Sequence, residues 1–139
     1  MRAVALASSA REHGNDPFGA LLVTESGVVV EAENTVVTAS DPTGHAETNL
    51  VRLAAAQLTP AELTTATLYT STEPCAMCCG AIFWAGIGRV VYALAESELN
   101  AMLPPESIGL VLDQFNHAVA DRRIAIGLVA PEPARMRAL

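Results

Sequence analysis

Lysine is absent from this chain of 139 residues, and all eight of its basic residues are arginines. Acidic residues number 15, so the formal net charge is −7. The arginines are scattered, with close pairs only at Arg122-Arg123 and at Arg135 and Arg137. Proteins that bind nucleic acid concentrate positive charge on one surface, because neutralisation of phosphates dominates their affinity. The composition therefore favours a small-molecule substrate and speaks against nucleic acid as a partner.

Long apolar runs are also missing. No stretch approaches the roughly 20 residues that span a bilayer, so we expect no membrane association. No charged segment followed by an apolar stretch and a cleavage site points to secretion. The three cysteines are too few for a disulfide framework, so the cytoplasm is the expected location. The length suits one domain, and we see no repeat or linker, so residues 1–139 are predicted to form a single domain.

The few cysteines lie in a segment that can bind metal. The sequence E-P-C-A-M-C occupies positions 73–78, and H-A-E occupies positions 45–47. Pro74 suits the first position of a helix, and cysteines three residues apart share one helix face. Two thiolates and one imidazole leave the fourth position of a zinc ion open, which is typical of catalytic sites. We therefore predict one Zn²⁺ per chain, with a catalytic water as fourth ligand and three protein ligands: His45, Cys75 and Cys78.

Other interpretations of the cysteine pair stay open. A redox pair would not need His45 and Glu47. A structural zinc site would need a fourth ligand, for which the remaining candidates are Cys79, His13 and His117. Cys79 should face about 100° away from Cys78 around the helix, and we interpret both histidines as surface or structural residues. A zinc-stabilised binding subunit is the non-enzymatic alternative.

Glu47 is the predicted catalytic residue. Two thiolates cancel the charge of a zinc ion, so such a site acidifies water less than a site of three histidines does. A nearby carboxylate is then needed as a base, and Glu47 supplies it. The pattern H-x-E…P-C-x-x-C resembles the signature of zinc deaminases that act on nucleobases. That resemblance implies that Glu47 moves protons from the nucleophilic water to a ring nitrogen and then to the amino group of an aminated heterocycle. The amino group leaves as ammonia.

The apolar periodicity predicts strands that alternate with helices. We expect helices at 1–13, 45–57 and 75–85, strands at 18–23, 28–33, 66–71 and 89–94, and irregular linkers at 35–44 and 58–65. After Leu94 the pattern weakens; it indicates a short helix at 96–102, a helix within 108–120, a strand at 123–129 and a helix from 131. This order predicts an α/β fold, a mixed sheet sandwiched by helices.

The two motifs resemble those of the cytidine deaminase-like superfamily. The segments D-P-T-G-H-A-E at 41–47 and T-E-P-C-A-M-C-C-G-A-I at 72–82 are similar to the guanine deaminase and tRNA adenosine deaminase branches. The resemblance implies a three-layer α/β/α sandwich with a five-stranded mixed sheet, zinc-bearing helices side by side, and a homodimer. It also implies hydrolytic deamination of a free nucleobase or similar heterocycle, guanine-like or cytosine-like. Deamination of adenosine in tRNA is the alternative.

The same resemblance implies four substrate contacts. Asn34 occupies the position of an asparagine that hydrogen-bonds the base, and Phe18 lies in a segment that lines the pocket of guanine deaminases. Trp84 belongs to an aromatic pair found in those enzymes, and Ala46 lies within the H-x-E motif. Three of them have a structural alternative: Asn34 could form a turn, and Phe18 and Trp84 could fill the core.

Overall fold

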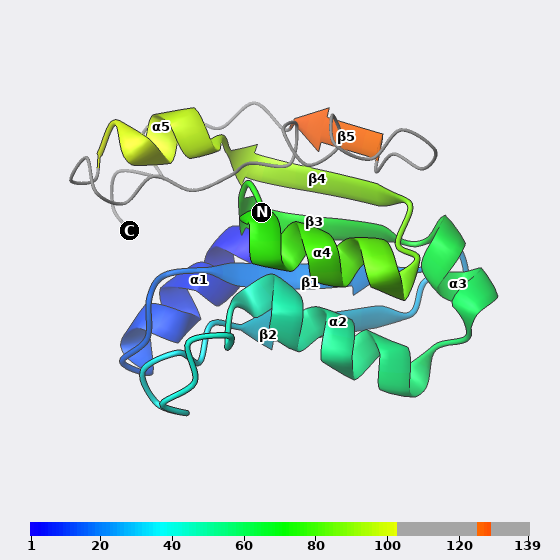
Figure 1. Ribbon diagram of the computed structural model, residues 1–139, viewed down its shortest axis with the longest axis horizontal. Coiled ribbons are helices and arrows are strands. Elements are labelled where there is room, and N and C mark those ends of the chain that lie inside the picture. The colour runs from blue at the N-terminus through cyan, green and yellow to red at the C-terminus, as the bar shows by residue number, and fades with distance from the viewer. Residues whose placement is uncertain (103–124, 129–139) are drawn as a thin grey trace.

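One mixed sheet runs through the part of the chain that the computed structural model describes, residues 1–102 and 125–128. Its strands are β1 (Gly19–Val23), β2 (Val29–Glu33), β3 (Thr67–Thr72), β4 (Arg89–Leu94) and β5 (Ala125–Leu128). They lie in the order β2-β1-β3-β4-β5 (Figure 1). β1 pairs antiparallel with β2 and β3, whereas β3, β4 and β5 are parallel. The expected mixed sheet is confirmed.

Helices cover both faces of this sheet. α1 (Arg2–Glu12) packs on one face against β1, β2 and β3. α2 (Ala46–Gln57) and α4 (Ala76–Ala85) lie side by side on the other face, in front of the sheet in Figure 1. Two short helices, α3 (Pro60–Thr65) and α5 (Glu96–Asn100), lie in the connections. The three-layer α/β/α sandwich and the adjacent pair of helices are therefore confirmed.

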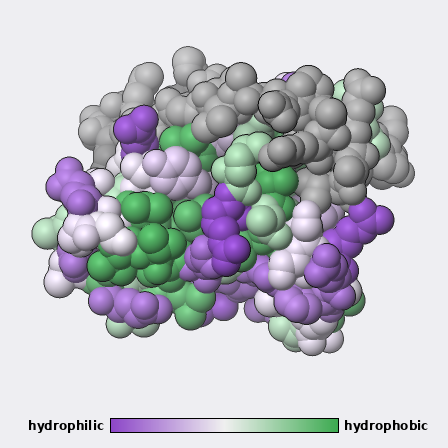
Figure 2. All heavy atoms as spheres, turned by 180° about the vertical axis from the view of Figure 1, so that it is seen from behind, coloured by the Kyte–Doolittle hydropathy of each residue, from purple (hydrophilic) through white to green (hydrophobic). Residues whose placement is uncertain are grey.

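The core lies between the sheet and the pair α2 and α4. Its fully buried members come from the strands, from the two helices and from the turn between α4 and β4: Ala20, Leu22, Ala46, Leu50, Ala54, Leu68, Cys79, Ile82, Ile87 and Val90. In α2, Leu50 and Ala54 are four residues apart and so share the inward face. The opposite face of the sheet, seen in Figure 2, shows apolar side chains beside the polar ones. A hollow of about 300 Å³ lies there between the start of α1 and strands β1, β3 and β4.

One helix was not predicted from the sequence. Residues 58–65 are not an irregular linker, because α3 occupies most of them. Thr59 accepts a hydrogen bond from the Glu62 N–H, and the Glu62 carboxylate accepts one from the Thr59 N–H. This reciprocal capping box is readable in the sequence Thr59-Pro60-Ala61-Glu62, which also has proline at the first helical position.

The start of α4 corrects a second prediction. Cys75 has extended backbone angles, φ −68° and ψ 171°, and is the N-cap residue. Pro74 therefore precedes the helix instead of occupying its first position. Gly86 ends α4 as expected, with a φ of 85° in the left-handed region that glycine adopts without strain.

The rest of the predicted elements agree with the structure or lie outside it. α1, α2, α5 and strands β1 to β4 match the predicted segments within a few residues. β5 lies inside the strand predicted at 123–129. The helices predicted within 108–120 and from 131, and His117, lie outside the described residues. Among the helices of the described residues, none is long and apolar enough to cross a bilayer.

Candidate metal centre

The N-terminal ends of α2 and α4 deliver the three predicted metal ligands. His45 is the N-cap of α2, and Cys75 is the N-cap of α4. Neither side chain caps its own helix, so both can turn towards a shared centre. Cys78 lies in the first turn of α4, where the positive end of the helix dipole favours a thiolate. Two separate segments of the chain thus meet at one point.

The three ligand atoms have the separations that zinc requires. His45 Nδ1 lies 3.6 Å from Cys75 Sγ and 3.6 Å from Cys78 Sγ, and the two sulfurs are 3.7 Å apart. Tetrahedral zinc, with bonds of about 2.3 Å to sulfur and about 2.0 Å to nitrogen, would separate such atoms by about 3.5–3.8 Å. Among the described residues these three form the group that could hold a metal. The donor set and its spacing therefore fit zinc.

The ligands also affect one another's protonation. The hydrogen bond between the two sulfurs, helped by His45, lowers the pKa of Cys75. The same bond, together with burial, raises the pKa of Cys78. The hydrogen bond with Cys75 raises the pKa of His45. Binding of a metal cation at this centre must therefore displace protons from the group.

Cys79 lies outside this group. Its side chain is fully buried in the core, and its thiol donates to the Pro74 carbonyl at 3.3 Å. Burial raises the pKa of Cys79 to about 12, so it stays a neutral thiol. The structure thus places Cys79 as a packing residue, as its direction around the helix indicated.

Glu47 lies beside the metal ligands without belonging to them. Its side chain is buried, and Cys78 Sγ lies 3.4 Å from Oε2. The Thr70 hydroxyl donates to Oε1 at 2.5 Å, from the neighbouring strand β3. Burial raises the pKa of Glu47, and the Thr70 hydrogen bond opposes that shift. One carboxylate oxygen is therefore anchored and the other faces the centre, an arrangement suited to proton transfer.

Of the four predicted substrate contacts, Ala46 directly follows a metal ligand, and Asn34 and Phe18 are joined by a backbone hydrogen bond. Ala46 is buried between His45 and Glu47 at the start of α2. Asn34 is also buried, and its backbone N–H donates to the Phe18 carbonyl at 3.0 Å. Phe18 is half-buried against the core.

Trp84 is the exception. It lies on the outward side of α4 with 84% of its surface exposed. Its ring contacts Phe83 edge-on, with ring centres 5.3 Å apart. Within the described chain, the structure does not bring Trp84 to the metal ligands.

Sequence reasoning missed several polar residues of the site. Thr70 holds Glu47, and the Thr48 hydroxyl lies 3.4 Å from Cys78 Sγ. Asn49 bonds the loop that leads to His45. The one available signal was the position of Thr48 and Asn49 directly after the H-x-E motif. Nothing in the sequence of β3 distinguishes Thr70, because the pairing of strand with helix that brings it to Glu47 is tertiary.

The chain is similar to several deaminases of known sequence or structure. The chain is 44% identical over 97 residues to a probable cytosine deaminase of Schizosaccharomyces pombe, covering 70% of this chain and 59% of that one. It is 43% identical over 98 residues to the guanine deaminase of Bacillus subtilis, covering 70% and 63%. The crystal structure of that guanine deaminase matches with a TM-score of 0.67 at 41% identity, covering 73% of this chain and 65% of the enzyme.

A third match comes from a structural study of A-to-I editing by tRNA:A34 deaminases, with a TM-score of 0.71, 29% identity, and coverage of 91% and 93%. The chain spans about three fifths of the length of the cytosine and guanine deaminases named above. Residues 1–94 match the family described as the cytidine and deoxycytidylate deaminase zinc-binding region. The match includes every predicted metal ligand. The chain therefore belongs to this zinc-binding deaminase family.

Proposed function

We propose that this protein is a zinc-dependent hydrolase that deaminates a free nucleobase or a similar aminated heterocycle, guanine-like or cytosine-like, and releases ammonia. One observation carries the proposal. Three zinc-type ligand atoms lie 3.6–3.7 Å apart, and a buried carboxylate that is not among the ligands lies 3.4 Å from one of them. A purely structural metal site does not need a carboxylate that can act as a general base.

The division of labour follows from the geometry. Bound by His45, Cys75 and Cys78, zinc would supply an activated water near neutral pH and polarise the substrate. Glu47 accepts the proton of the attacking water at Oε2, because Thr70 occupies Oε1. It passes this proton to the ring nitrogen. It then takes the second proton of the water from the new hydroxyl group on the ring carbon and gives it to the amino group, which leaves as ammonia when the carbon–nitrogen bond breaks. Burial suits this role, since a raised pKa lets the carboxyl group hold a proton between steps.

Asn34 is proposed to form a hydrogen bond with the edge of the base. Its Oδ1 accepts a hydrogen bond from the Val36 N–H at 3.0 Å. This bond orients the amide and leaves the NH₂ group as the donor for a substrate. Asn34 would therefore recognise an acceptor on the ring, such as a carbonyl oxygen or an unprotonated nitrogen. Phe18 supplies apolar surface nearby, and Ala46 leaves room beside the ligands.

Deamination of adenosine in tRNA is the second candidate. The likeness to a tRNA:A34 deaminase structure, which covers 91% of this chain, favours it. The net charge of −7 and the absence of lysine oppose it, because a phosphate backbone is bound through positive charge. The higher identity to the guanine and cytosine deaminases also favours a free base.

An ammonia-release assay on the zinc-loaded protein tests the proposal. Guanine, cytosine, adenine, their nucleosides and a tRNA anticodon stem-loop are compared at low and high salt. We expect turnover of a free base with little dependence on salt. Conversion of the stem-loop alone, falling steeply as salt rises, would support the second candidate. Absence of turnover with every compound would contradict both.

We further propose that the outward face of α4 forms a homodimer interface. The helix sequence A-M-C-C-G-A-I-F-W-A has no charged residue and no strongly polar one. Met77 is 37% exposed and Trp84 is 84% exposed, seven positions apart and thus on one face. A helix that is apolar on every side is normally buried on every side. The family resemblance supports a second copy of this chain as the partner.

Substitution of Trp84 tests this interface. We expect Trp84→Glu to convert a dimer into a monomer in analytical ultracentrifugation. Val28→Glu, at an exposed apolar residue in the turn between β1 and β2, is the matched control and should leave the assembly unchanged. A Trp84→Glu protein that stays dimeric but loses affinity for the base would restore the stacking role predicted from the sequence. The single domain spanning 1–139 and the cytoplasmic location stay predictions.

A further inference from the structure

We propose that Asn49 is a positioning residue that fixes the distance between the metal ligand His45 and the substrate contact Asn34. The part that concerns Asn34 rests on the proposed function. The part that concerns His45 rests only on the zinc-binding centre. The side-chain hydrogen bonds of Asn49 go to neighbours of His45 and Asn34 and to Arg52, so Asn49 acts through the backbone that carries the ligand and the substrate contact.

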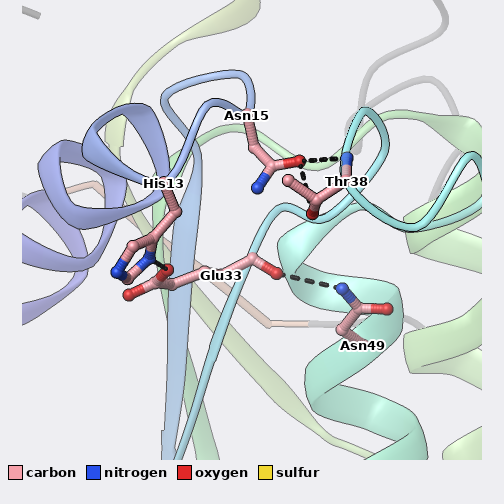
Figure 3. Close-up of polar contacts among 5 residues, drawn as sticks. All are labelled: His13, Asn15, Glu33, Thr38 and Asn49. Atoms are coloured by element: carbon pink, nitrogen blue, oxygen red, sulfur yellow. Dashed lines mark hydrogen bonds and ion pairs between the residues drawn. The ribbon is translucent and has the colours of Figure 1, made fainter.

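One amide group bonds both ends of the loop at 34–45. Asn49 Nδ2 donates to the Glu33 carbonyl at 2.9 Å, to the Thr35 hydroxyl at 2.9 Å and to the Gly44 carbonyl at 3.2 Å. Figure 3 shows the first of these bonds, from α2 to the end of β2. An NH₂ group has two hydrogens, so three acceptors converge on it and share them.

The three acceptors flank the functional residues. Glu33 and Thr35 stand on either side of Asn34, and Gly44 directly precedes His45. The Thr35 N–H also donates to the Gly44 carbonyl at 2.8 Å, which closes the loop at its base. The closure is tight, because a Cβ atom on Gly44 would lie 2.8 Å from Thr35 Oγ1. Asn34 and His45 are therefore held next to each other by a junction that Asn49 completes.

The orientation of the amide is itself fixed. Arg52 Nη1 donates to Asn49 Oδ1 at 3.4 Å, which turns the NH₂ group towards the loop. Asn49 lies on α2 between the ligand-bearing N-cap and the buried residue Leu50. Its side chain therefore ties the loop to the helix that also carries Glu47. Loop, metal ligand and general base share one rigid support.

A second amide provides a matched control. Asn15 Oδ1 accepts from the Thr38 N–H at 3.0 Å and from the Thr38 hydroxyl at 3.1 Å (Figure 3). These bonds hold the middle of the same loop, away from Asn34 and His45. A loss of loop packing alone should therefore appear in variants of either asparagine. A loss of positioning should appear only in variants of Asn49.

The test compares Asn49→Asp with Asn15→Leu in the zinc-loaded protein of residues 1–139. Asn49→Asp keeps the shape of the side chain and removes its NH₂ donor. The first measurement is the rate at which zinc passes to an excess of chelator. The second is kcat and KM on the base that the wild-type protein converts. Unfolding midpoints of both variants show whether they lose similar stability. Asn49→Ser, which keeps one hydroxyl donor, serves if Asn49→Asp does not fold.

We expect Asn49→Asp to release zinc about 10–100-fold faster than the wild type, the usual effect of losing a group that orients a metal ligand. KM should rise as well, while Asn15→Leu stays close to the wild-type values. Asn49→Ser should release zinc at an intermediate rate. Equal release rates in the two asparagine variants, or a wild-type rate in Asn49→Asp, would overturn the proposal.

Two further outcomes separate its parts. Faster zinc release with unchanged KM would overturn the link to Asn34. If the wild-type protein converts no base at all, the proposed function fails, but zinc release still decides the role of Asn49 towards His45.

Discussion

His45 reaches the metal centre at the end of a polar loop, whereas Cys75 and Cys78 reach it at the start of an apolar helix. The loop is held by side-chain amides, with Asn49 bonding its ends and Asn15 its middle. The helix is held by burial, since Cys78, Cys79 and Ile82 are fully buried. Directional hydrogen bonds fix one half of the centre and close packing fixes the other. The two halves should therefore fail in different ways.

Removal of a ligand from the helix should have the largest effect. We expect Cys78→Ala to lose zinc and all measurable turnover, because two ligands cannot hold a catalytic zinc. Elemental analysis of the purified protein measures the metal. Cys79→Ala is the control and should keep its zinc, since Cys79 donates only to the Pro74 carbonyl. A metal-free Cys79 variant beside a loaded Cys78 variant would refute the ligand assignment.

Loss of packing under the same helix should lower the stability of the fold and leave the zinc content unchanged. Ile82 is fully buried in the core, so Ile82→Ala should lower the free energy of unfolding by about 2–5 kcal/mol. Denaturant unfolding measures this loss. Zinc per folded molecule should stay at the wild-type value. An Ile82→Ala protein that lost zinc while its free energy of unfolding was unchanged would show that packing does not hold α4 in place.

The two halves also differ in how far sequence predicts them. Two short motifs predict the ligands His45, Cys75 and Cys78 and the base Glu47. The residue types and their spacing in these motifs are enough to indicate a zinc site with a general base. The sheet and helices follow from apolar periodicity, and even the missed α3 has a readable capping box at Thr59 and Glu62. These features depend on residues close together in the chain, so they can be predicted from the sequence.

The contacts that support the ligands and the base join residues far apart in the chain, so they cannot be predicted from the sequence. Thr70 meets Glu47 only because the fold brings this residue of β3 close to the start of α2. Asn49 meets Glu33 only because β2 ends beside the same helix. Trp84 was predicted to stack on a base because it is aromatic and close to the motif, but its direction around α4 turns it to the outside. Register and helix rotation decide such contacts, and both are set by the assembled fold.

A smaller effect is expected at Thr70, the contact that joins the sheet to the catalytic base. Thr70→Val keeps the shape of the side chain and removes the hydrogen bond to Glu47, a bond to a charged group worth about 1.5–3 kcal/mol. We expect kcat to fall about 10–100-fold by the same energy. KM and zinc content should change little. Thr70→Ser keeps the hydroxyl and should recover most of the rate; failure of this recovery would show that the methyl group, not the hydrogen bond, matters.

The most direct measurement is a side-by-side assay of zinc-loaded wild-type protein and Glu47→Gln on guanine and cytosine. The amide keeps the size of the side chain but cannot carry a proton. The account predicts ammonia release by the wild-type protein. It predicts that Glu47→Gln keeps its zinc and loses turnover by about 10²–10⁴-fold or more. Turnover near the wild-type rate in a fully loaded Glu47→Gln protein would contradict the assignment of Glu47 as the proton carrier of a deaminase.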